Sequence, residues 1–253
     1  MSQEFEQNPY ATPTSQLQRE QPAAATASIE EILARGYDFR IGEVIGEAWH
    51  KVKGMKGTLV VAAIIYGVAV NLLSFIIAFV LALLGVIHES ASGSGPLEIL
   101  VSVFAGALCY PLLAGLNMIG IRRAAEQPAT INEMFAYFGL FTPLLITGLA
   151  VTCLTYVGIF LLLLPGIYLG VSYALAIPLV VERGLSPWKA MEASRKAIGQ
   201  HWFKVFGLFV ALGLILLVSA IPLMIGLVWT LPLAFIALGV LYRTIFGVSP
   251  PAN

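Results

Sequence analysis

Charged residues are scarce in this sequence of 253 residues. Asp, Glu, Lys and Arg together make up 11% of the chain, against about 25% in a soluble globular domain. Hydrophobic residues make up 58%. Four stretches contain no Asp, Glu, Lys, Arg or His: Gly57–Ile87, Ile99–Ile121, Met134–Val181 and Val205–Tyr242. This composition excludes a soluble globular domain and predicts an integral membrane protein.

The lengths of these uncharged stretches predict the number of membrane crossings. One crossing needs about 20 apolar residues, so the third and the fourth stretch are each long enough for two. We therefore expect an all-α polytopic membrane protein with six transmembrane helices arranged as three hairpins. An amphipathic interfacial helix is expected before each hairpin, on the cytoplasmic side.

The sequence also predicts two regions of different character. Residues 1–37 are rich in polar and small residues, so they bury too little apolar surface to offset the entropy of ordering. We expect these residues to form a disordered cytoplasmic tail. Residues 38–248 are expected to form the six-helix transmembrane domain.

Residues that carry enzyme chemistry are missing as well. The two cysteines, Cys109 and Cys153, both lie in uncharged stretches without metal or redox spacing, which favours a packing role. The sequence has no HExxH, GxSxG or Walker motif. We therefore predict a protein that is not an enzyme and has no catalytic residue, metal or cofactor. The lack of ionisable residues in the spans also argues against proton-coupled transport.

The positive charges that are present follow a pattern. All fourteen Lys and Arg residues lie in the N-terminal part, after the second span, between the fourth and fifth spans, or after the sixth. By the positive-inside rule, this alternation predicts that both termini are cytoplasmic in a bacterial inner (plasma) membrane. The net charge of zero provides no argument for a nucleic-acid partner.

The clearest of the amphipathic segments is Gly184–Trp202. Ser186 is suited to cap its first turn, and Pro187 fits the first helical position. Its apolar face is predicted to carry Trp188, Met191, Ile198 and Trp202. Tryptophan beside a basic face suits the lipid headgroup layer, and a short soluble helix in a loop is the alternative.

Two other segments have the same character. Helical spacing of apolar residues runs from Ile41 to Val52, where Glu47 and Lys51 form a favourable i,i+4 pair. Thr130 and Glu133 have the spacing of a capping box. This second segment carries a predicted apolar stripe of Ile131, Met134, Phe135 and Phe138.

The three segments indicate an internal repeat. Glu47 aligns with Glu192, and Lys51 with Lys196, at the same offset, and an arginine follows each predicted hairpin: Arg122, Arg183 and Arg243. Duplication and chance similarity between apolar sequences both explain these matches.

Proline and glycine residues mark turns and contacts within the spans. Pro165-Gly166 predicts the turn of the second hairpin, and Gly166 with Gly170 permits close helix approach. Pro111, Pro178 and Pro232 either kink or interrupt the second helix of each hairpin.

Two motifs resemble a known family. The first is Ser186-Pro187-Trp188-x-Ala190-x-x-x-Ser194, within Leu161–Phe209, and the second is Tyr242-Arg243-x-x-x-Gly247. Over roughly Phe39–Gly247 the chain resembles the YciC-like bacterial inner-membrane proteins, which are related to the membrane domain of some glycerophosphodiester phosphodiesterases. The resemblance implies a six-helix inner-membrane protein of uncharacterised role, and no catalytic residue carries over.

The remaining candidate site is a belt of cations on the predicted cytoplasmic side. The belt consists of Lys51, Lys53, Lys56, Arg122, Arg123, Arg183, Lys189, Arg195, Lys196 and Arg243. The last seven of these are the candidate contact residues. Membrane orientation alone explains such a belt, and binding of anionic lipid headgroups or of a membrane or cytoplasmic protein partner is the second explanation. The leading hypothesis is a scaffold, an envelope-homeostasis factor or a lipid-interacting module, and a transporter or channel for a small or lipophilic substrate is the alternative.

Overall fold

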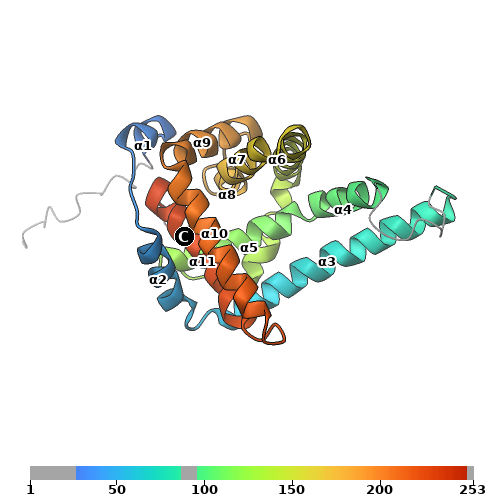
Figure 1. Cartoon of the computed structure of the whole chain (residues 1–253), viewed down its shortest axis with the longest axis horizontal. Coiled ribbons are helices and arrows are strands. Elements are labelled where there is room, and N and C mark those ends of the chain that lie inside the picture. Colours follow the sequence, from blue (N-terminus) through green and yellow to red (C-terminus); the bar gives the residue numbers. More distant parts are fainter. Residues whose placement is uncertain (1–26, 87–95, 250–253) are drawn as a thin grey trace, which may run out of the picture.

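The structure is a computed structural model that describes residues 27–86 and 96–249 (Figure 1). These residues form helices and connecting turns, without a strand, so the predicted all-α class is confirmed. Five helical segments are long and apolar enough to cross a membrane, and a bent pair makes up to six.

The five segments have the following bounds. They are α3 (Lys56–Leu83), α6 (Phe141–Leu161) with the 3-10 turns η1 (Ile131–Phe135) and η2 (Phe138–Leu140) before it, α7 (Leu163–Ser172) with α8 (Ala176–Glu182), α10 (Trp202–Ala220) and α11 (Leu227–Phe246). The bent pair is α4 (Pro96–Leu108) and α5 (Tyr110–Ala124), which meet at 58°. The shorter helices are α1 (Ile29–Arg35), α2 (Ile41–Val52) and α9 (Pro187–Gln200).

The centre of the molecule is the crossing of α5 and α11. A Cβ atom on Gly120 would lie 2.5 Å from the carbonyl oxygen of Phe235, and one on Gly239 would lie 2.4 Å from the carbonyl oxygen of Gly120. Both distances are shorter than any van der Waals contact, so only glycine allows the two backbones to meet here. Neighbouring residues Ile119 and Ile236 are fully buried.

A second close contact joins α6 to α7. A Cβ atom on Gly166 would lie 2.4 Å from the backbone nitrogen of Ile159, and one on Gly170 would lie 3.4 Å from Thr155. The close approach predicted from Gly166 and Gly170 is therefore confirmed. The predicted turn at Pro165-Gly166 is wrong, because the chain turns at the extended residue Leu162 and Pro165 belongs to the first turn of α7, where its missing N–H costs no helical bond.

The structure distinguishes the two expectations for the prolines. Pro111 follows the break between α4 and α5 at Cys109, and Pro178 lies in the first turn of α8, after the break from α7. Pro232 instead lies inside α11, which continues through it. Two of the three helices are therefore interrupted.

The segment after α5 differs from its prediction. Its residues form the 3-10 turns η1 and η2 instead of an α-helix, and the Thr130 side chain makes no cap hydrogen bond. The predicted capping box is wrong because the Glu133 carboxylate pairs with Arg122 at 2.9 Å and accepts a hydrogen bond from the Tyr137 hydroxyl. The predicted stripe is also divided, since Met134 is buried and Phe135 is exposed.

The N-terminal region contains a helix that the sequence analysis did not predict. Residues Ile29–Arg35 form α1, which begins with a capping box between Ser28 and Glu31 and buries Ile32. The predicted disorder of residues 1–37 is thus corrected for residues 29–37, and residues 1–26 lie outside the described part. In α2, the predicted pair between Glu47 and Lys51 is confirmed at 3.0 Å.

The spans do not run side by side throughout. In Figure 1, α3 and α4 project together from one side of the body, at a steep angle to α10. The Lys56 ammonium at the start of α3 lies 5.3 Å from the ring centre of Trp229 at the start of α11. The predicted topology places these two residues on opposite membrane faces, so this contact does not fit the predicted position of the start of α3 in the membrane.

Candidate functional site

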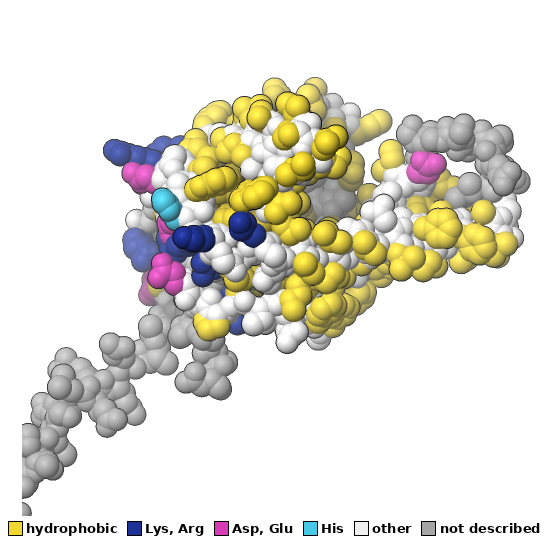
Figure 2. All heavy atoms as spheres, turned by 90° about the horizontal axis from the view of Figure 1, so that it is seen from below, with side chains coloured by type: hydrophobic (Ala, Val, Ile, Leu, Met, Phe, Trp, Pro, Cys, Tyr) yellow, Lys and Arg dark blue, Asp and Glu magenta, His cyan; other side chains and the backbone are white. Residues whose placement is uncertain are grey.

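The charged side chains of the molecule are unevenly distributed. Figure 2 shows Lys, Arg, Asp and Glu gathered mainly at one end of the visible face, with hydrophobic side chains over most of the rest. The candidate cations lie on α5, α9 and α11 and just after α8.

Arg243, near the end of α11, forms an ion pair with α2, which belongs to the first predicted repeat. Its Nη2 atom lies 2.8 Å from a carboxylate oxygen of Glu47 on α2. Lys51 shares this carboxylate at 3.0 Å and also lies 3.1 Å from Glu126. The hydrogen bond from Lys51 lowers the pKa of the Glu126 carboxyl. Arg243 is therefore held within the protein.

Arg122 and Arg123, at the end of α5, are also engaged. Arg122 pairs with Glu133 at 2.9 Å. Arg123 donates hydrogen bonds of 2.8 Å to the backbone carbonyl of Lys51, near the end of α2, and to that of Lys53, just after it. Because these carbonyls lack helical partners, Arg123 fixes the passage from α2 to α3.

Arg183 lies in the most buried ionic cluster among the described residues. It lies 2.7 Å from Glu182, and the two side chains are only 9% and 5% exposed. The Tyr242 hydroxyl donates to Glu182 at 2.7 Å, and the backbone N–H of Ser249 donates to the same carboxylate at 2.8 Å. Arg183 also donates to the carbonyl of Phe246. This cluster joins α8 to the end of α11.

Helix α9 is anchored through Ser194, which is fully buried. Its hydroxyl donates to the carbonyl of Ser172 at 2.7 Å and accepts from the backbone N–H of Leu175 at 3.2 Å. Both backbone groups flank the break between α7 and α8, where helical partners are missing. Ser194 therefore provides, from another helix, the hydrogen-bond partners that these two backbone groups lack within their own span.

The buried face of α9 differs in part from the predicted one. Met191 and Ile198 are buried as part of it, whereas Trp188 is 72% exposed. Pro187 occupies the first helical position as predicted, but the side chain of Ser186 makes no cap hydrogen bond. Trp188 thus points away from the core.

The cations of α9 are the most accessible of the candidates. Arg195 and Lys196 share Glu192 at 2.9 Å and 3.3 Å, and the hydrogen bond from Arg195 is the main reason that the pKa of the Glu192 carboxyl is lowered. Lys189 is exposed. Among the described residues, it makes no hydrogen bond or ion pair.

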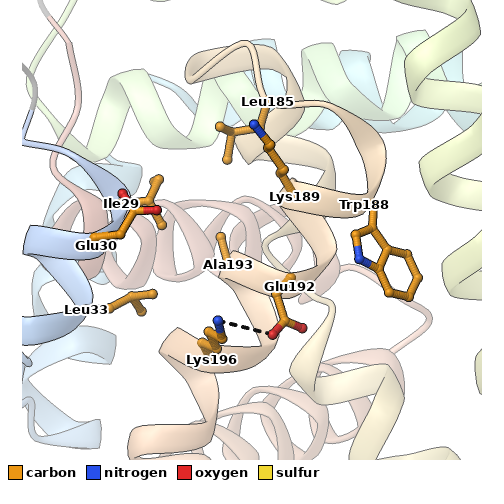
Figure 3. Close-up of a pocket in the computed structure, with 9 residues that line it drawn as sticks. All are labelled: Ile29, Glu30, Leu33, Leu185, Trp188, Lys189, Glu192, Ala193 and Lys196. Carbon is orange, nitrogen blue, oxygen red and sulfur yellow. Dashed lines mark ion pairs between the residues drawn. The ribbon is translucent and has the colours of Figure 1, made fainter.

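A groove of about 380 Å³ lies between α1 and α9 (Figure 3). Two of these cations, Lys189 and Lys196, are among its lining residues. Helix α1 forms one wall, and α9 with Leu185 before it forms the other. The lining residues are Ile29, Glu30, Leu33, Leu185, Trp188, Lys189, Glu192, Ala193 and Lys196. In Figure 3, the side chain of Lys196 points toward Glu192. The groove combines an apolar surface with charges of both signs.

The wall formed by α1 was missed by sequence reasoning. Ser28 and Glu31 have the spacing of a capping box, and Ile29, Ile32 and Leu33 have helical spacing, but the surrounding polar composition favoured disorder. A long-range hydrogen bond helps to hold α1, since the side chain of Gln200 donates to the carbonyl of Leu33 at 2.8 Å. Gln200 lies far from α1 in the sequence, so local patterns do not predict this contact.

The comparisons with known proteins support no functional assignment. No family model matches the chain, and no solved structure matches it. Uncharacterized proteins Mb2590 of Mycobacterium bovis and Rv2560 of Mycobacterium tuberculosis are each 26% identical to it over 183 residues, covering 64% of this chain and 55% of each relative. The chain thus matches about half the length of these relatives. Among the described residues, no group of three or more His, Cys, Asp or Glu is placed to hold a metal ion.

Proposed function

We propose that this chain is a non-enzymatic membrane protein of the bacterial inner membrane, and that it acts as a lipid-interacting module through α9. In this proposal α3 with α4 and α5, α6 with α7 and α8, and α10 with α11 are the three hairpins. Helix α9 lies at the cytoplasmic surface, and both termini are cytoplasmic. The YciC-like resemblance and the positive-inside pattern support this arrangement.

The observation that carries the proposal is the free cation at the groove. Arg122, Arg123, Arg183 and Arg243 are bound to partners within the protein. Lys189 has no such partner in the described part of the chain and is exposed beside an apolar groove. Phosphate is the anionic group that every phospholipid presents at the surface of a bilayer, so Lys189 is placed to bind it.

The surroundings of α9 support a position at the membrane boundary. The exposed ring of Trp188 lies at the groove, and indole rings favour the headgroup level of a bilayer. Helix α10 begins two residues after α9 ends and carries Phe203 and Leu217, which are 84% and 66% exposed. An apolar surface of this kind suits the acyl chains of the lipid.

The proposal is tested by lipid co-purification in mild detergent, with native mass spectrometry as the readout. The test variant changes Lys189, Arg195 and Lys196 to Gln. One cation near an anionic membrane surface contributes about 1 kcal/mol, or about fivefold, so we expect the triple variant to retain at least fivefold less phospholipid.

The matched control changes three exposed cations that do not line the groove, Arg35, Arg40 and Lys53, to Gln. It removes the same net charge, and we expect it to retain phospholipid like the unmodified chain. Equal retention by the triple variant and the unmodified chain would refute lipid binding at α9.

A transporter or channel is the second candidate, and the interrupted helices favour it. Helices α4 and α5 meet at a 58° bend, and α7 and α8 are separated by a break. Interrupted helices in transporters expose backbone groups to a substrate. The hydroxyl of Ser194 hydrogen-bonds the backbone groups of Ser172 and Leu175 at the break between α7 and α8. This contact supports a structural role for that break. Unitary currents in planar bilayers containing the purified chain would favour a channel.

A further inference from the structure

We infer that the groove between α1 and α9 binds phosphatidylethanolamine, a phospholipid whose headgroup carries a phosphate and a primary ammonium. The lipid phosphate contacts Lys189 on α9, and the ammonium contacts Glu30 on α1. This inference rests on the proposed phospholipid contact and specifies the headgroup.

The charges of the groove select a zwitterionic headgroup. Its lining contains two lysines and two glutamates, so its formal charge is zero. Glu192 is already engaged, since Arg195 binds it at 2.9 Å and Lys196 at 3.3 Å. Lys189 and Glu30 remain, since neither makes a hydrogen bond or an ion pair among residues 27–86 and 96–249, and both side chains are exposed. One free cation and one free anion therefore line the same groove.

The two residues come from different walls of the groove. Glu30 comes from α1, and Lys189 comes from α9, as Figure 3 shows. A phosphatidylethanolamine headgroup presents its phosphate next to the glycerol and its ammonium at the tip, so it offers one charge to each helix. An anionic headgroup such as phosphatidylglycerol leaves Glu30 without a partner. Phosphatidylcholine lacks the N–H groups that donate to a carboxylate.

The size and the apolar lining of the groove fit this part of a lipid. A volume of about 380 Å³ lies near the lower end of small-molecule sites, which span about 300–1,000 Å³. It therefore accommodates a headgroup with its glycerol, and the acyl chains remain in the bilayer. Ile29, Leu33 and Leu185 provide apolar walls for the glycerol region.

A bound headgroup also ties α1 to the body of the protein. Helix α1 has only seven residues, and helices shorter than about 12 residues are marginal on their own. Its docking depends on the buried Ile32, the hydrogen bond from Gln200 to Leu33 and a weaker one from Arg183 to Ala27. A lipid bridging Glu30 and Lys189 adds a contact between the two helices.

The inference is tested by lipid competition on the purified full-length chain. Mixed micelles contain equal amounts of phosphatidylethanolamine, phosphatidylcholine and phosphatidylglycerol with identical acyl chains, and native mass spectrometry counts each bound lipid. We expect about threefold to fivefold more phosphatidylethanolamine to be retained than either of the other two lipids, because exposed ion pairs contribute little free energy. Glu30→Gln should abolish this preference while total lipid retention persists, and Glu43→Gln serves as the matched control.

A charge exchange tests the pairing directly. Lys189→Glu alone should lower retention of all three lipids, and adding Glu30→Lys should restore the preference for phosphatidylethanolamine over phosphatidylcholine. Circular dichroism identical to that of the unmodified chain establishes that each variant is folded. Failure of the folded double variant to restore the preference would overturn the assignment.

The remaining outcomes separate the two proposals. If phosphatidylglycerol binds as well as phosphatidylethanolamine, or if Glu30→Gln leaves the preference unchanged, the headgroup assignment is wrong and lipid binding at α9 stands. If the unmodified chain retains none of the three lipids, the proposed function itself is wrong.

Discussion

Arg243, near the end of α11, forms an ion pair of 2.8 Å with Glu47 in α2. The two residues are almost two hundred positions apart, and they belong to the third and the first of the predicted repeats. The preceding residue, Tyr242, donates a hydrogen bond to Glu182, at the end of the second. The Tyr-Arg dipeptide therefore joins the C-terminal helix to both other parts of the molecule.

The aligned segments also share a local contact. Glu47 pairs with Lys51 at 3.0 Å, and Glu192 pairs with Lys196 at 3.3 Å. The two pairs occupy equivalent positions in the predicted repeat. Each glutamate also binds an arginine, Arg243 in the first case and Arg195 in the second. The Glu–Lys pair is common to both segments, whereas Arg243 comes from α11 and Arg195 from α9 itself.

Replacing Arg243 with Gln should destabilise the protein. The side chains of Arg243 and Glu47 are about one-third exposed, so we expect a loss of about 1 kcal/mol in the free energy of unfolding. Thermal unfolding in detergent, followed by tryptophan fluorescence, provides the measurement. Arg40→Gln removes an exposed ion pair within α2 and should change the transition little. Equal effects of the two substitutions would contradict a special role for Arg243.

Replacing Gly239 with Ala should disrupt the crossing of α5 and α11. The added methyl group would meet the backbone of Gly120 at 2.4 Å, and overpacking of this kind costs about 1–3 kcal/mol. Gly213→Ala, in α10, is the matched control because no atom lies within 4 Å of the added methyl group. We expect Gly239→Ala to lower the unfolding temperature and Gly213→Ala to preserve or raise it. A tolerated Gly239→Ala would argue against this crossing.

Ser194→Ala should loosen the attachment of α9 to the break between α7 and α8. It leaves the carbonyl of Ser172 and the N–H of Leu175 without the partner seen here, and a buried unsatisfied polar group costs about 1–3 kcal/mol. Amide hydrogen exchange should increase around residues 172–175. Ser74→Ala, within α3, should leave the exchange there unchanged. Unaltered protection in Ser194→Ala would show that Ser194 does not hold the break.

Acidification should weaken the contact between Asp38 and Lys204. The hydrogen bond from Lys204 lowers the pKa of the Asp38 carboxyl. Because this pKa is lower in the folded state than in the unfolded state, the contact stabilises the fold at pH values above the ordinary pKa of aspartate, about 3.9. This stabilisation is lost as the pH falls through the lower pKa of the folded state. Unfolding temperatures should therefore decline from about pH 4 downward. Asp38→Asn should reduce the steepness of this decline, and an unchanged slope would contradict the prediction.

The orientation of the chain is tested with reporters fused after Asn253. We expect a fluorescent protein that folds only in the cytoplasm to be bright in this position, because the basic residues lie in the predicted cytoplasmic segments. An alkaline phosphatase fused at the same position should be inactive. An active phosphatase would place the C-terminus outside the inner membrane and reverse the proposed topology.

Local chemistry made part of the fold predictable. Uncharged runs predicted the helical class and the presence of several candidate spans, since each apolar segment must satisfy its backbone groups internally. The i,i+4 spacing predicted the pair between Glu47 and Lys51, and the spacing of Gly166 and Gly170 predicted the approach of α6 and α7. Each depends on residues that are close together in the sequence.

The candidate site depended more on distant partners. By itself the sequence determined that basic residues gather in alternate segments and that α9 carries several of them. Only the tertiary structure decided that Arg243 is held by Glu47 and Arg122 by Glu133, and that Lys189 remains without a partner in the described part of the chain. It also brought Glu30 on α1 to the groove beside Lys189. The physical reason is that the partner of a charge is set by which helices pack together, and helical periodicity carries no information about that packing.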